Sequence, residues 1–255
     1  TYKGVAAKDG FDRMISESAA FIDVGGGSLQ ITLFINGSVV TTQHLAIGTM
    51  RLMEMLSDIE HNVRNLEKQL EELVDKELAV FRAQYMRAGE EVKNVILMGA
   101  YITEIMGKLK KSGEMANVVE AEKFVGFLQK LDNKTVEEIS EALNLSNEKD
   151  MLVLPSVILY VKLTQAMHAH TIWFPDVDTS DGIVYDYAHT HKIVRPAHDF
   201  DEDILSAAKN MSMRYMSYSQ HIDALTEMSS LLFDAIKKEH GMGKRERLLL
   251  KVAAI

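Results

Sequence analysis

The chain has 255 residues, of which 47% are apolar and 25% are charged, and its formal net charge is −9. This composition is typical of a globular protein with a buried core, built as one large domain or two smaller ones. The acidic charge argues against nucleic acid and anionic membranes as partners, and the absence of cysteine excludes disulfides and thiolate chemistry and fits a cytoplasmic protein.

The first predicted elements are three strands near the start of the sequence. Apolar runs at 19–24 and 28–35 read as strands and enclose the glycine triplet 25–27. Asn36-Gly37 then forms a two-residue hairpin turn, because both residue types tolerate the positive φ angles that such turns need. The turn leads into a third strand near 38–46. These segments predict a hairpin that begins directly after a glycine-rich loop.

Helical and strand patterns alternate along the middle of the chain. Apolar residues recur every three to four positions at 49–60, at 62–87, in two segments between 119 and 150, and in a long segment that begins or breaks near Pro155. The second segment between 119 and 150 opens with Thr135 and Glu138, the spacing of a capping box. Short apolar runs at 94–100 and 171–174 read as strands. The alternation predicts an α/β fold with helices on a mixed sheet, the segment 62–87 packing on the sheet or, as the alternative, in a coiled coil.

The pattern changes after Pro196. The remaining sequence contains no strand-like run and is helical almost throughout, with a break at "HGMG" (240–243). We therefore predict an α/β domain over 1–192 and an all-helical domain over 193–255. Because the chain begins without Met and stops in an apolar stretch, we expect it to be a fragment of a longer protein.

The stretch "DVGGGS" at 23–28 is the main candidate for a functional site. Glycines leave backbone N–H groups open to close approach by a ligand. Asp23 offers carboxylate oxygens, which Mg²⁺ prefers and commonly shares with phosphate, and Ser28 adds a hydroxyl group. These residues indicate phosphate binding, with a tight turn that binds nothing as the structural alternative. Neither the GxxxxGK[ST] loop nor the GxGxxG pattern is present.

The order of these motifs resembles the second lobe of the actin-like ATPase superfamily, which has a ribonuclease H-like fold. Within it, the chain is most similar to the exopolyphosphatase and guanosine pentaphosphate phosphohydrolase family, whose pattern is close to "DIGGGSTE", a later "G" and a "GGT"-like turn. The corresponding segments here are "DVGGGSLQ" (23–30), "LAIGTMRLMEML" (45–56), "ILMGAYIT" (96–103), "LPSVILYVKLTQAM" (154–167) and "DTSDGIVYDYA" (178–188). The tail, with His221, resembles the start of that family's HD-type helical domain.

The resemblance implies a site and an activity. The family removes a terminal phosphate from inorganic polyphosphate or guanosine pentaphosphate, with water as the attacking group. Asp23 would hold Mg²⁺ or Mn²⁺, Gly48 and Gly99 would line the other side of the cleft, and the phosphates would bind at Gly25, Gly26, Gly27 and Ser28. The helical tail would be a candidate surface for a homodimer. The first lobe, with its own phosphate loop, would be missing from this chain, so we expect the fragment alone to be inactive.

Two departures from the family pattern leave the activity open. Gln30 stands where the family has Glu, and an amide can orient water but cannot accept its proton. Tyr101 stands in the "GGT"-like turn and is predicted to narrow the phosphate path. The alternatives are a hydrolase, a regulatory protein that binds polyphosphate or the alarmone without hydrolysis, and an ATP-dependent sugar or acetate kinase of the same superfamily.

The remaining histidines have plainer interpretations. His168 with His170, and His189 with His191, form two HxH pairs that could bind a metal on a strand. The first pair closes a predicted helix and the second lies near a loop, so exposed or capping roles are the default. His221 is interpreted as a helix-surface residue.

Overall fold

The computed structural model describes residues 1–57, 66–87, 91–109, 117–132, 134, 136–145, 152–196 and 198–255. In these residues, one mixed sheet of six strands has the order β3-β2-β1-β4-β6-β5. Neighbours β1 and β4, and β4 and β6, run parallel, and the other neighbouring pairs are antiparallel. The strands are β1 (Ser18–Val24), β2 (Leu29–Ile35), β3 (Ser38–Leu45), β4 (Asn94–Gly99), β5 (Val118–Glu120) and β6 (Thr171–Trp173).

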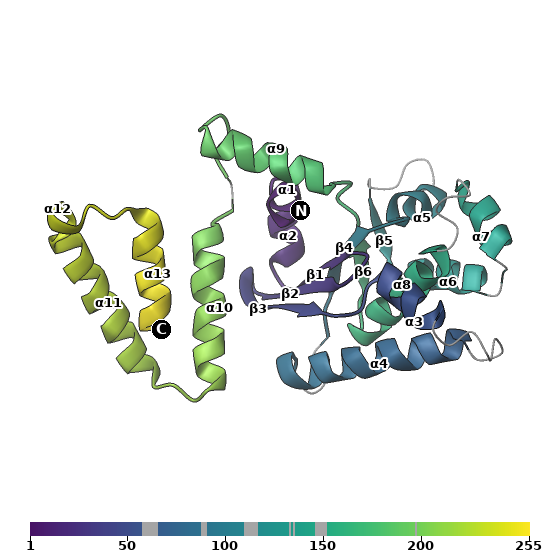
Figure 1. The fold of residues 1–255 in the computed structure, drawn as a ribbon, viewed down its shortest axis with the longest axis horizontal. Helices are drawn as coiled ribbons and strands as arrows, with labels where there is room; N and C mark the ends of the chain where they lie inside the picture. The colour runs from purple at the N-terminus through teal and green to yellow at the C-terminus, as the bar shows by residue number, and fades with distance from the viewer. Residues whose placement is uncertain are drawn as a thin grey trace.

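Helices cover the sheet and form the C-terminal part. In Figure 1, α1, α2 and α9 lie above the strands and α4 lies below them, while α10 stands beside the β3 edge. The helices of the α/β part are α1 (Tyr2–Ala6), α2 (Phe11–Ile15), α3 (Thr49–Ser57), α4 (Leu66–Tyr85), α5 (Ile102–Leu109), α6 (Ala121–Asp132), α7 (Val136–Leu143), α8 (Val153–Ala166) and α9 (Thr179–Thr190). The helical tail consists of α10 (Phe200–Arg214), α11 (Ser219–Ala235), α12 (Lys237–His240) and α13 (Lys244–Ala254).

The predicted hairpin turn at Asn36-Gly37 is confirmed. Asn36 and Gly37 have φ angles of 51° and 79°, and Ile35 pairs with Ser38 across the two-residue loop. Further along the hairpin, a bulge shifts the register between Leu33 and Phe34. This one-residue shift decides which side chains of β2 and β3 lie opposite each other near the glycine loop.

The central strands are apolar in their middle because both of their faces are covered there. Phe21 and Ile22 of β1 and Ile96 and Leu97 of β4 are all at most 1% exposed. Burial of each such side chain stabilises the fold by about 1.5–3 kcal/mol. This core fixes the ends of β1 and β4 relative to each other, with Val24 paired to Gly99.

Some elements differ from the sequence prediction. The strand β5 is only three residues long, too short for a periodic pattern, and lies where a helix is predicted to begin. The short helices α1 and α2 precede the first predicted strand and are not predicted. The predicted helical positions 58–65 and the predicted cap at Thr135 lie outside the described residues. The helix α4 packs against α8, as a helix of the α/β part.

The helical tail contacts the α/β part through α10. The side chain of Asn210 donates a hydrogen bond to the carbonyl of Val39 in β3 at 3.1 Å, and no residue of α10 is fully buried. The predicted boundary between 192 and 193 falls between α9 and α10, and the division into two domains stays a prediction.

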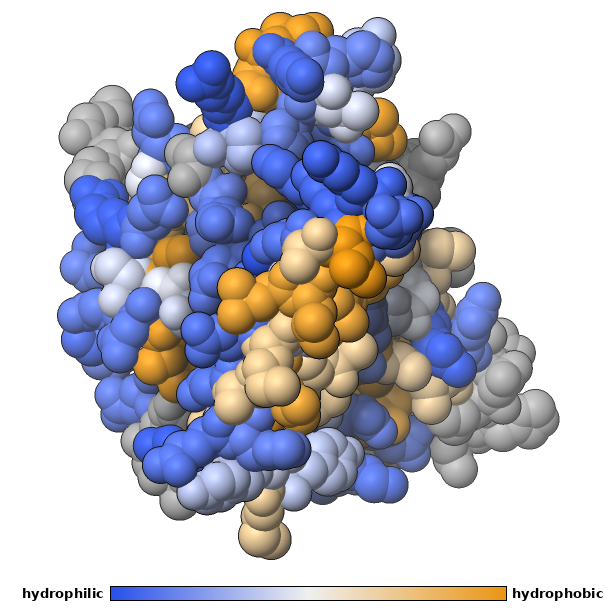
Figure 2. All heavy atoms as spheres, turned by 90° about the vertical axis from the view of Figure 1, so that its left-hand side faces the viewer, coloured by the Kyte–Doolittle hydropathy of each residue, from blue (hydrophilic) through white to orange (hydrophobic). Residues whose placement is uncertain are grey.

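Figure 2 faces the helical tail and shows a patch of apolar side chains on it. Exposed apolar patches of this kind commonly mark interaction surfaces. The predicted homodimer surface nevertheless stays a prediction. The exposed apolar residues of α11 to α13 and their connections include Leu225, Met228, Leu231, Leu232, Ile236, Met242 and Leu249.

Among the described residues, no helix combines the length and hydropathy needed to cross a membrane.

The hairpin turn yields a matched pair of glycine substitutions. Gly37→Ala places a Cβ at a φ of 79° and should lower the free energy of unfolding by about 1–2 kcal/mol. Gly126→Ala, inside α6 with open space around the new Cβ, should raise that free energy by up to about 1 kcal/mol. Urea denaturation of both variants measures the difference. Equal stability of the two would contradict the assigned turn.

Candidate functional site

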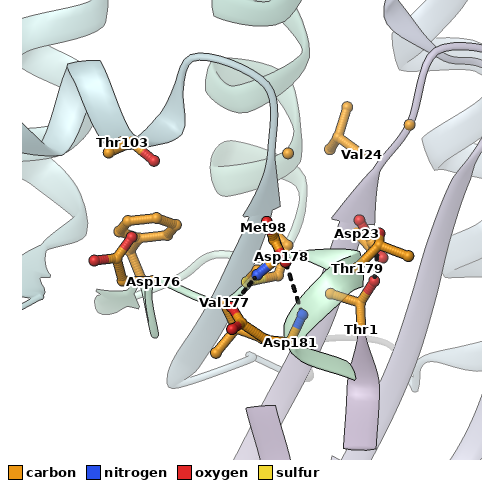
Figure 3. Close-up of a pocket in the computed structure, with 13 residues that line it drawn as sticks. Thr1, Asp23, Val24, Met98, Thr103, Asp176, Val177, Asp178, Thr179 and Asp181 are labelled. Carbon is orange, nitrogen blue, oxygen red and sulfur yellow. Dashed lines mark hydrogen bonds between the residues drawn. The ribbon is translucent and has the colours of Figure 1, made fainter. Parts of the chain in front are cut away.

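A cavity of about 470 Å³ opens where the parallel strands end. The carboxyl ends of β1, β4 and β6 meet at one edge of the sheet, and the segments that follow each strand contribute to its wall (Figure 3). Such edges of α/β sheets are common ligand sites. The lining residues are Thr1, Asp23, Val24, Gly25, Met98, Gly99, Thr103, Phe174, Asp176, Val177, Asp178, Thr179 and Asp181.

The glycine loop after β1 is held by the first turn of α3. The carbonyl of Gly25 accepts a hydrogen bond from the N–H of Thr49 at 3.1 Å. The carbonyl of Gly26 accepts from the N–H groups of Met50 and Arg51 at 2.9 and 3.1 Å. These bonds satisfy backbone donors at the start of the helix, which have no partner within it.

The same loop also has backbone N–H groups that bond to no other described residue. The N–H of Gly25 bonds to the carbonyl of Ser28 at 3.0 Å and closes a tight turn. The N–H groups of Gly26, Gly27 and Ser28 have no hydrogen-bond partner among the described residues. Successive free N–H groups at a turn form a concave anion site. The loop therefore offers backbone donors to an anion, and Gly25 lines the cavity whereas Gly26, Gly27 and Ser28 are not among its lining residues.

Gly48 supports the loop and does not line the cavity. A Cβ at this position would lie 2.4 Å from the carbonyl oxygen of Gly26 and 2.6 Å from the backbone nitrogen of Ser28. The resemblance places Gly48 on the opposite side of a cleft, whereas the structure places it against the loop itself. Only glycine lets the start of α3 approach the loop this closely.

Gly99 lies in the cavity wall at the end of β4. Its φ angle is 147°, and a Cβ there would lie 2.6 Å from the hydroxyl oxygen of Tyr160. That hydroxyl is buried and donates a hydrogen bond to the carbonyl of Ala100. Burial, with a further contribution from the charge of Asp23, raises the pKa of Tyr160, so the phenol stays neutral. The hydroxyl of Tyr160 thus fixes the backbone turn that follows β4.

The predicted obstruction by Tyr101 is wrong. The Tyr101 side chain is 6% exposed, packs in the core and is absent from the cavity wall. Its backbone adopts a φ of 61°, which turns the chain from β4 into α5 and directs the ring inward. The path to Asp23 is therefore not narrowed by this residue.

Asp23, Gln30 and His44 form a row across three strands. Asp23 pairs directly with Gln30, and Gln30 pairs directly with His44. Directly paired residues point to the same face of a sheet, with Cβ atoms about 4.5–5.5 Å apart. The row ends at Asp23 in the cavity wall. Gln30 is therefore the immediate neighbour of the candidate metal ligand.

His44 in this row is not found by sequence reasoning. Counting back from the Asn36-Gly37 turn with regular pairing puts Gln43 opposite Gln30. The bulge shifts the register by one residue, so His44 takes that place and Gln43 faces the other side. The hairpin signal in the sequence carries no information on where such a bulge falls.

The cavity wall carries four carboxylates and no basic side chain among its thirteen lining residues. Asp178 caps α9 by accepting from the N–H of Asp181 at 2.8 Å, and the carboxylate of Asp181 accepts from the N–H of Asp178 at 3.0 Å. The carboxylates of Asp23 and Asp176 make no hydrogen bond or ion pair with another described residue. The three aspartates at 176, 178 and 181 are not among the predicted site residues. One feature of the sequence could have indicated these aspartates: they follow the strand at 171–173, whose carboxyl end reaches the same edge of the sheet as Asp23.

The donor set at Asp23 fits a hard divalent cation that is shared with a ligand. Carboxylate oxygens facing a polar cavity suit Mg²⁺ or Mn²⁺. In the described ranges, no group of three or more ligating side chains is arranged to hold a metal by itself. Phosphate oxygens and water would have to complete the coordination.

The histidine pairs do not gather at this site. His168 lies 2.9 Å from a guanidinium nitrogen of Arg82, and His170 lies 3.3 Å from a carboxylate oxygen of Glu91. His191 stacks on the ring of Tyr187 with centroids 4.0 Å apart. Each of these rings has a surface partner.

Comparisons with known proteins agree with this architecture. A family profile described as the Ppx/GppA phosphatase family matches residues 6–191. Among solved structures, the Aquifex aeolicus member of the Ppx/GppA family has a TM-score of 0.56 and 15% identity, covering 78% of this chain and 64% of that chain. An exopolyphosphatase from Cytophaga hutchinsonii has a TM-score of 0.55 and 15% identity, covering 77% and 63%.

A third solved structure, an exopolyphosphatase-like protein, has a TM-score of 0.57 and 16% identity, covering 75% of this chain and 66% of that chain. At these identities the similarity shows the fold. The chain spans less than two thirds of the length of each of the three proteins. A search of curated proteins found no match.

The contact between Gly48 and the loop predicts the effect of one added methyl group. Gly48→Ala should displace the loop and lower the free energy of unfolding by about 1–3 kcal/mol. Gly27→Ala, where the new Cβ meets nothing within 4 Å, should change that free energy by less than about 0.5 kcal/mol. Thermal and urea unfolding measure both variants. An unchanged free energy of unfolding in Gly48→Ala would refute the close approach of α3 to the loop.

Proposed function

The chain belongs to the Ppx/GppA phosphatase family, and from that premise we propose that it binds the terminal phosphates of an inorganic polyphosphate or of guanosine pentaphosphate. The site is the cavity at the ends of β1, β4 and β6. The observation that carries the proposal is the glycine loop, which directly follows the strand that ends with Asp23 and Val24 and whose N–H groups at Gly26, Gly27 and Ser28 have no hydrogen-bond partner among the described residues.

The loop would hold phosphate oxygens through its backbone. Three N–H donors in one turn can bond to the equatorial oxygens of one phosphoryl group, and they supply no charge of their own beyond their dipoles. This matters because the cavity wall is acidic. A polyanion enters such a wall only with counter-charge, so we propose that it binds as its Mg²⁺ or Mn²⁺ complex, with Asp23 as the protein ligand.

The chemistry at this site would be stabilisation of a transferring phosphoryl group. A divalent cation, when bound, neutralises charge that develops on the phosphate oxygens. The loop is held by α3 through the carbonyls of Gly25 and Gly26, so its N–H groups need no rearrangement to receive that charge. Gln30, next to Asp23, can hold a water by donating and accepting hydrogen bonds. It cannot take the proton from that water.

Gln30 supports a second candidate function, a protein that binds the phosphate chain and signals without cutting it. The amide occupies the position directly paired with Asp23, which is where a carboxylate would be close enough to act on the same water or cation. In this alternative, a general base would be absent from the row. Hydrolysis in the longer protein would then depend on groups beyond residues 23–30.

The proposed role of Asp23 can be tested by binding. Titration calorimetry with inorganic polyphosphate and Mg²⁺ should show binding to the chain, and Asp23→Asn should weaken it by roughly ten- to hundredfold because one charged oxygen ligand is lost. Asp9→Asn removes an exposed carboxylate that does not line the cavity and should leave the affinity unchanged. An equal loss of affinity in both variants, or no binding by the unaltered chain, would count against the proposed site.

The choice between hydrolase and binder can be tested with matched variants in the full-length protein. If the protein is a binder, Gln30→Glu should raise phosphate release by roughly a hundredfold or more, because a carboxylate can accept the proton from water. Gln43→Glu makes the same chemical change on the opposite face of the hairpin and should have no effect. Robust phosphate release by the unaltered protein would instead establish the hydrolase and remove the alternative.

A further inference from the structure

A second polar cluster lies where the helical tail meets the α/β part, away from the loop site. It consists of His198, Tyr2, Asp12 and Asp203 and is called here the His198 cluster. The side chains of His198 and Asp203 are only 10% and 12% exposed. The rings of Phe11 and Phe200 contact the imidazole edge to face, each with centroids 5.2 Å away.

Both nitrogens of the imidazole face carboxylates. Nε2 lies 2.8 Å from Oδ2 of Asp203, and Nδ1 lies 3.8 Å from Oδ1 of Asp12. The hydroxyl of Tyr2 donates to the same Oδ2 of Asp203 at 2.6 Å. A neutral imidazole has one donor and would turn a lone pair towards one of the two carboxylates. The imidazolium, with a donor at each nitrogen, fits both.

The surrounding charges favour the protonated ring. The hydrogen bond to Asp203 raises the pKa of His198, burial opposes this, and the charges of Asp203, Asp12 and Asp199 add to the increase. Burial, followed by the bond to Asp203, raises the pKa of Tyr2 and keeps its phenol protonated.

Two further basic groups lie near the ring. Lys3 and His189 share a cavity of about 490 Å³ with His198, and that cavity also contains Asp199 and Asp201. The ammonium of Lys3 is paired with Asp186, so it offsets little of the negative charge around His198.

The cluster joins three helices from both parts of the chain. Tyr2 belongs to α1, Asp12 to α2 and Asp203 to α10, while His198 lies in the connection that follows α9. The rest of the interface runs along β3, where Phe200 and Ala207 of α10 pack against the core of the α/β part although no residue of α10 is fully buried. Its other side-chain contacts include the Asn210 bond to β3 and the guanidinium of Arg214 over the ring of Tyr85 at 4.4 Å.

We propose that the protonated His198 is a clamp that docks α10, and with it the helical tail, on α1 and α2, and that the docking loosens as the pH rises. A group whose pKa is higher in the docked state contributes its full stabilisation below its free pKa. That contribution is lost as the pH rises through the docked-state value. The tail should therefore be held in mildly acidic solution and released in mildly alkaline solution.

The clamp is connected to the loop site through α1 and α9. Thr1, directly before Tyr2, lines the cavity at Asp23. Lys3 of α1 binds Asp186 of α9, and the start of α9 contributes Asp178 and Asp181 to the same cavity. Movement of α10 away from α1 would remove one support of this wall. The proposal rests on the cluster geometry and stands independently of the phosphate-binding proposal.

The test uses the absence of cysteine from the chain. Spin labels at Ser16→Cys and Ser217→Cys, both exposed, report the distance between the α/β part and the end of α10. We expect one narrow distance distribution at about pH 5.5 and a several-fold larger share of long distances at about pH 8.5, on either side of the ordinary histidine pKa of about 6.5. His198→Gln should give the broad distribution at both pH values.

The controls separate the clamp from general effects of pH. His221→Gln removes an exposed histidine of α11 and should leave the pH response unchanged. Asp12→Asn removes a carboxylate that is 74% exposed and should move the midpoint of the response to lower pH without unfolding the protein. Identical distributions at both pH values, or a pH response that survives in His198→Gln, would overturn the proposal.

If His198→Gln fails to fold by circular dichroism, NMR titration of the unaltered chain decides the question. The imidazole of His198 should then titrate above the ordinary histidine pKa of about 6.5. A midpoint at or below that ordinary value would overturn the clamp.

Discussion

The candidate site depends on the hydrogen bonds between the glycine loop and the first turn of α3. Carbonyls of Gly25 and Gly26 satisfy the N–H groups at the start of that helix. This arrangement fixes the loop and leaves its own N–H groups available to a ligand. It requires backbone-to-backbone contact, and Gly48 provides it, since any side chain there would collide with the loop. The glycines thus have two separate functions, which are close packing of α3 against the loop and backbone donors without a partner in the loop itself.

The electrostatics of the site follow from that arrangement. The chain is acidic overall, and the cavity wall continues this character with four carboxylates. Recognition of a polyanion through basic side chains is therefore absent from this wall. Backbone dipoles and a shared divalent cation are the means that remain. The proposed function has the same physical basis as the loop geometry.

The His198 cluster depends on titratable side chains, whereas the loop site depends on backbone groups. It gathers one imidazole, one phenol and two carboxylates at a junction between helices, where a single proton changes the balance of charge. The N–H donors of the loop site are backbone groups that do not titrate near neutral pH. The junction can respond to mild changes in pH through His198, and α1 and α9 connect it to the cavity.

The sequence by itself determined the local elements. Strong periodicity predicted the main strands and helices, the Asn36-Gly37 pair predicted the hairpin turn, and the glycine run predicted a loop beside Asp23. These features are encoded by neighbouring residues, through backbone preferences and the alternation of apolar side chains. Elements too short for a period, such as the strand at 118–120, lacked that signal.

Only the tertiary structure decided which distant residues meet. The bulge beside Leu33 shifted the hairpin register and placed His44, not Gln43, next to Gln30. The packing of Tyr101 into the core reversed the expected obstruction of the cavity. The His198 cluster joins residues almost two hundred positions apart in the sequence. Register shifts and long-range contacts depend on the summed packing of the whole sheet and its helices, and no local pattern of residues specifies them.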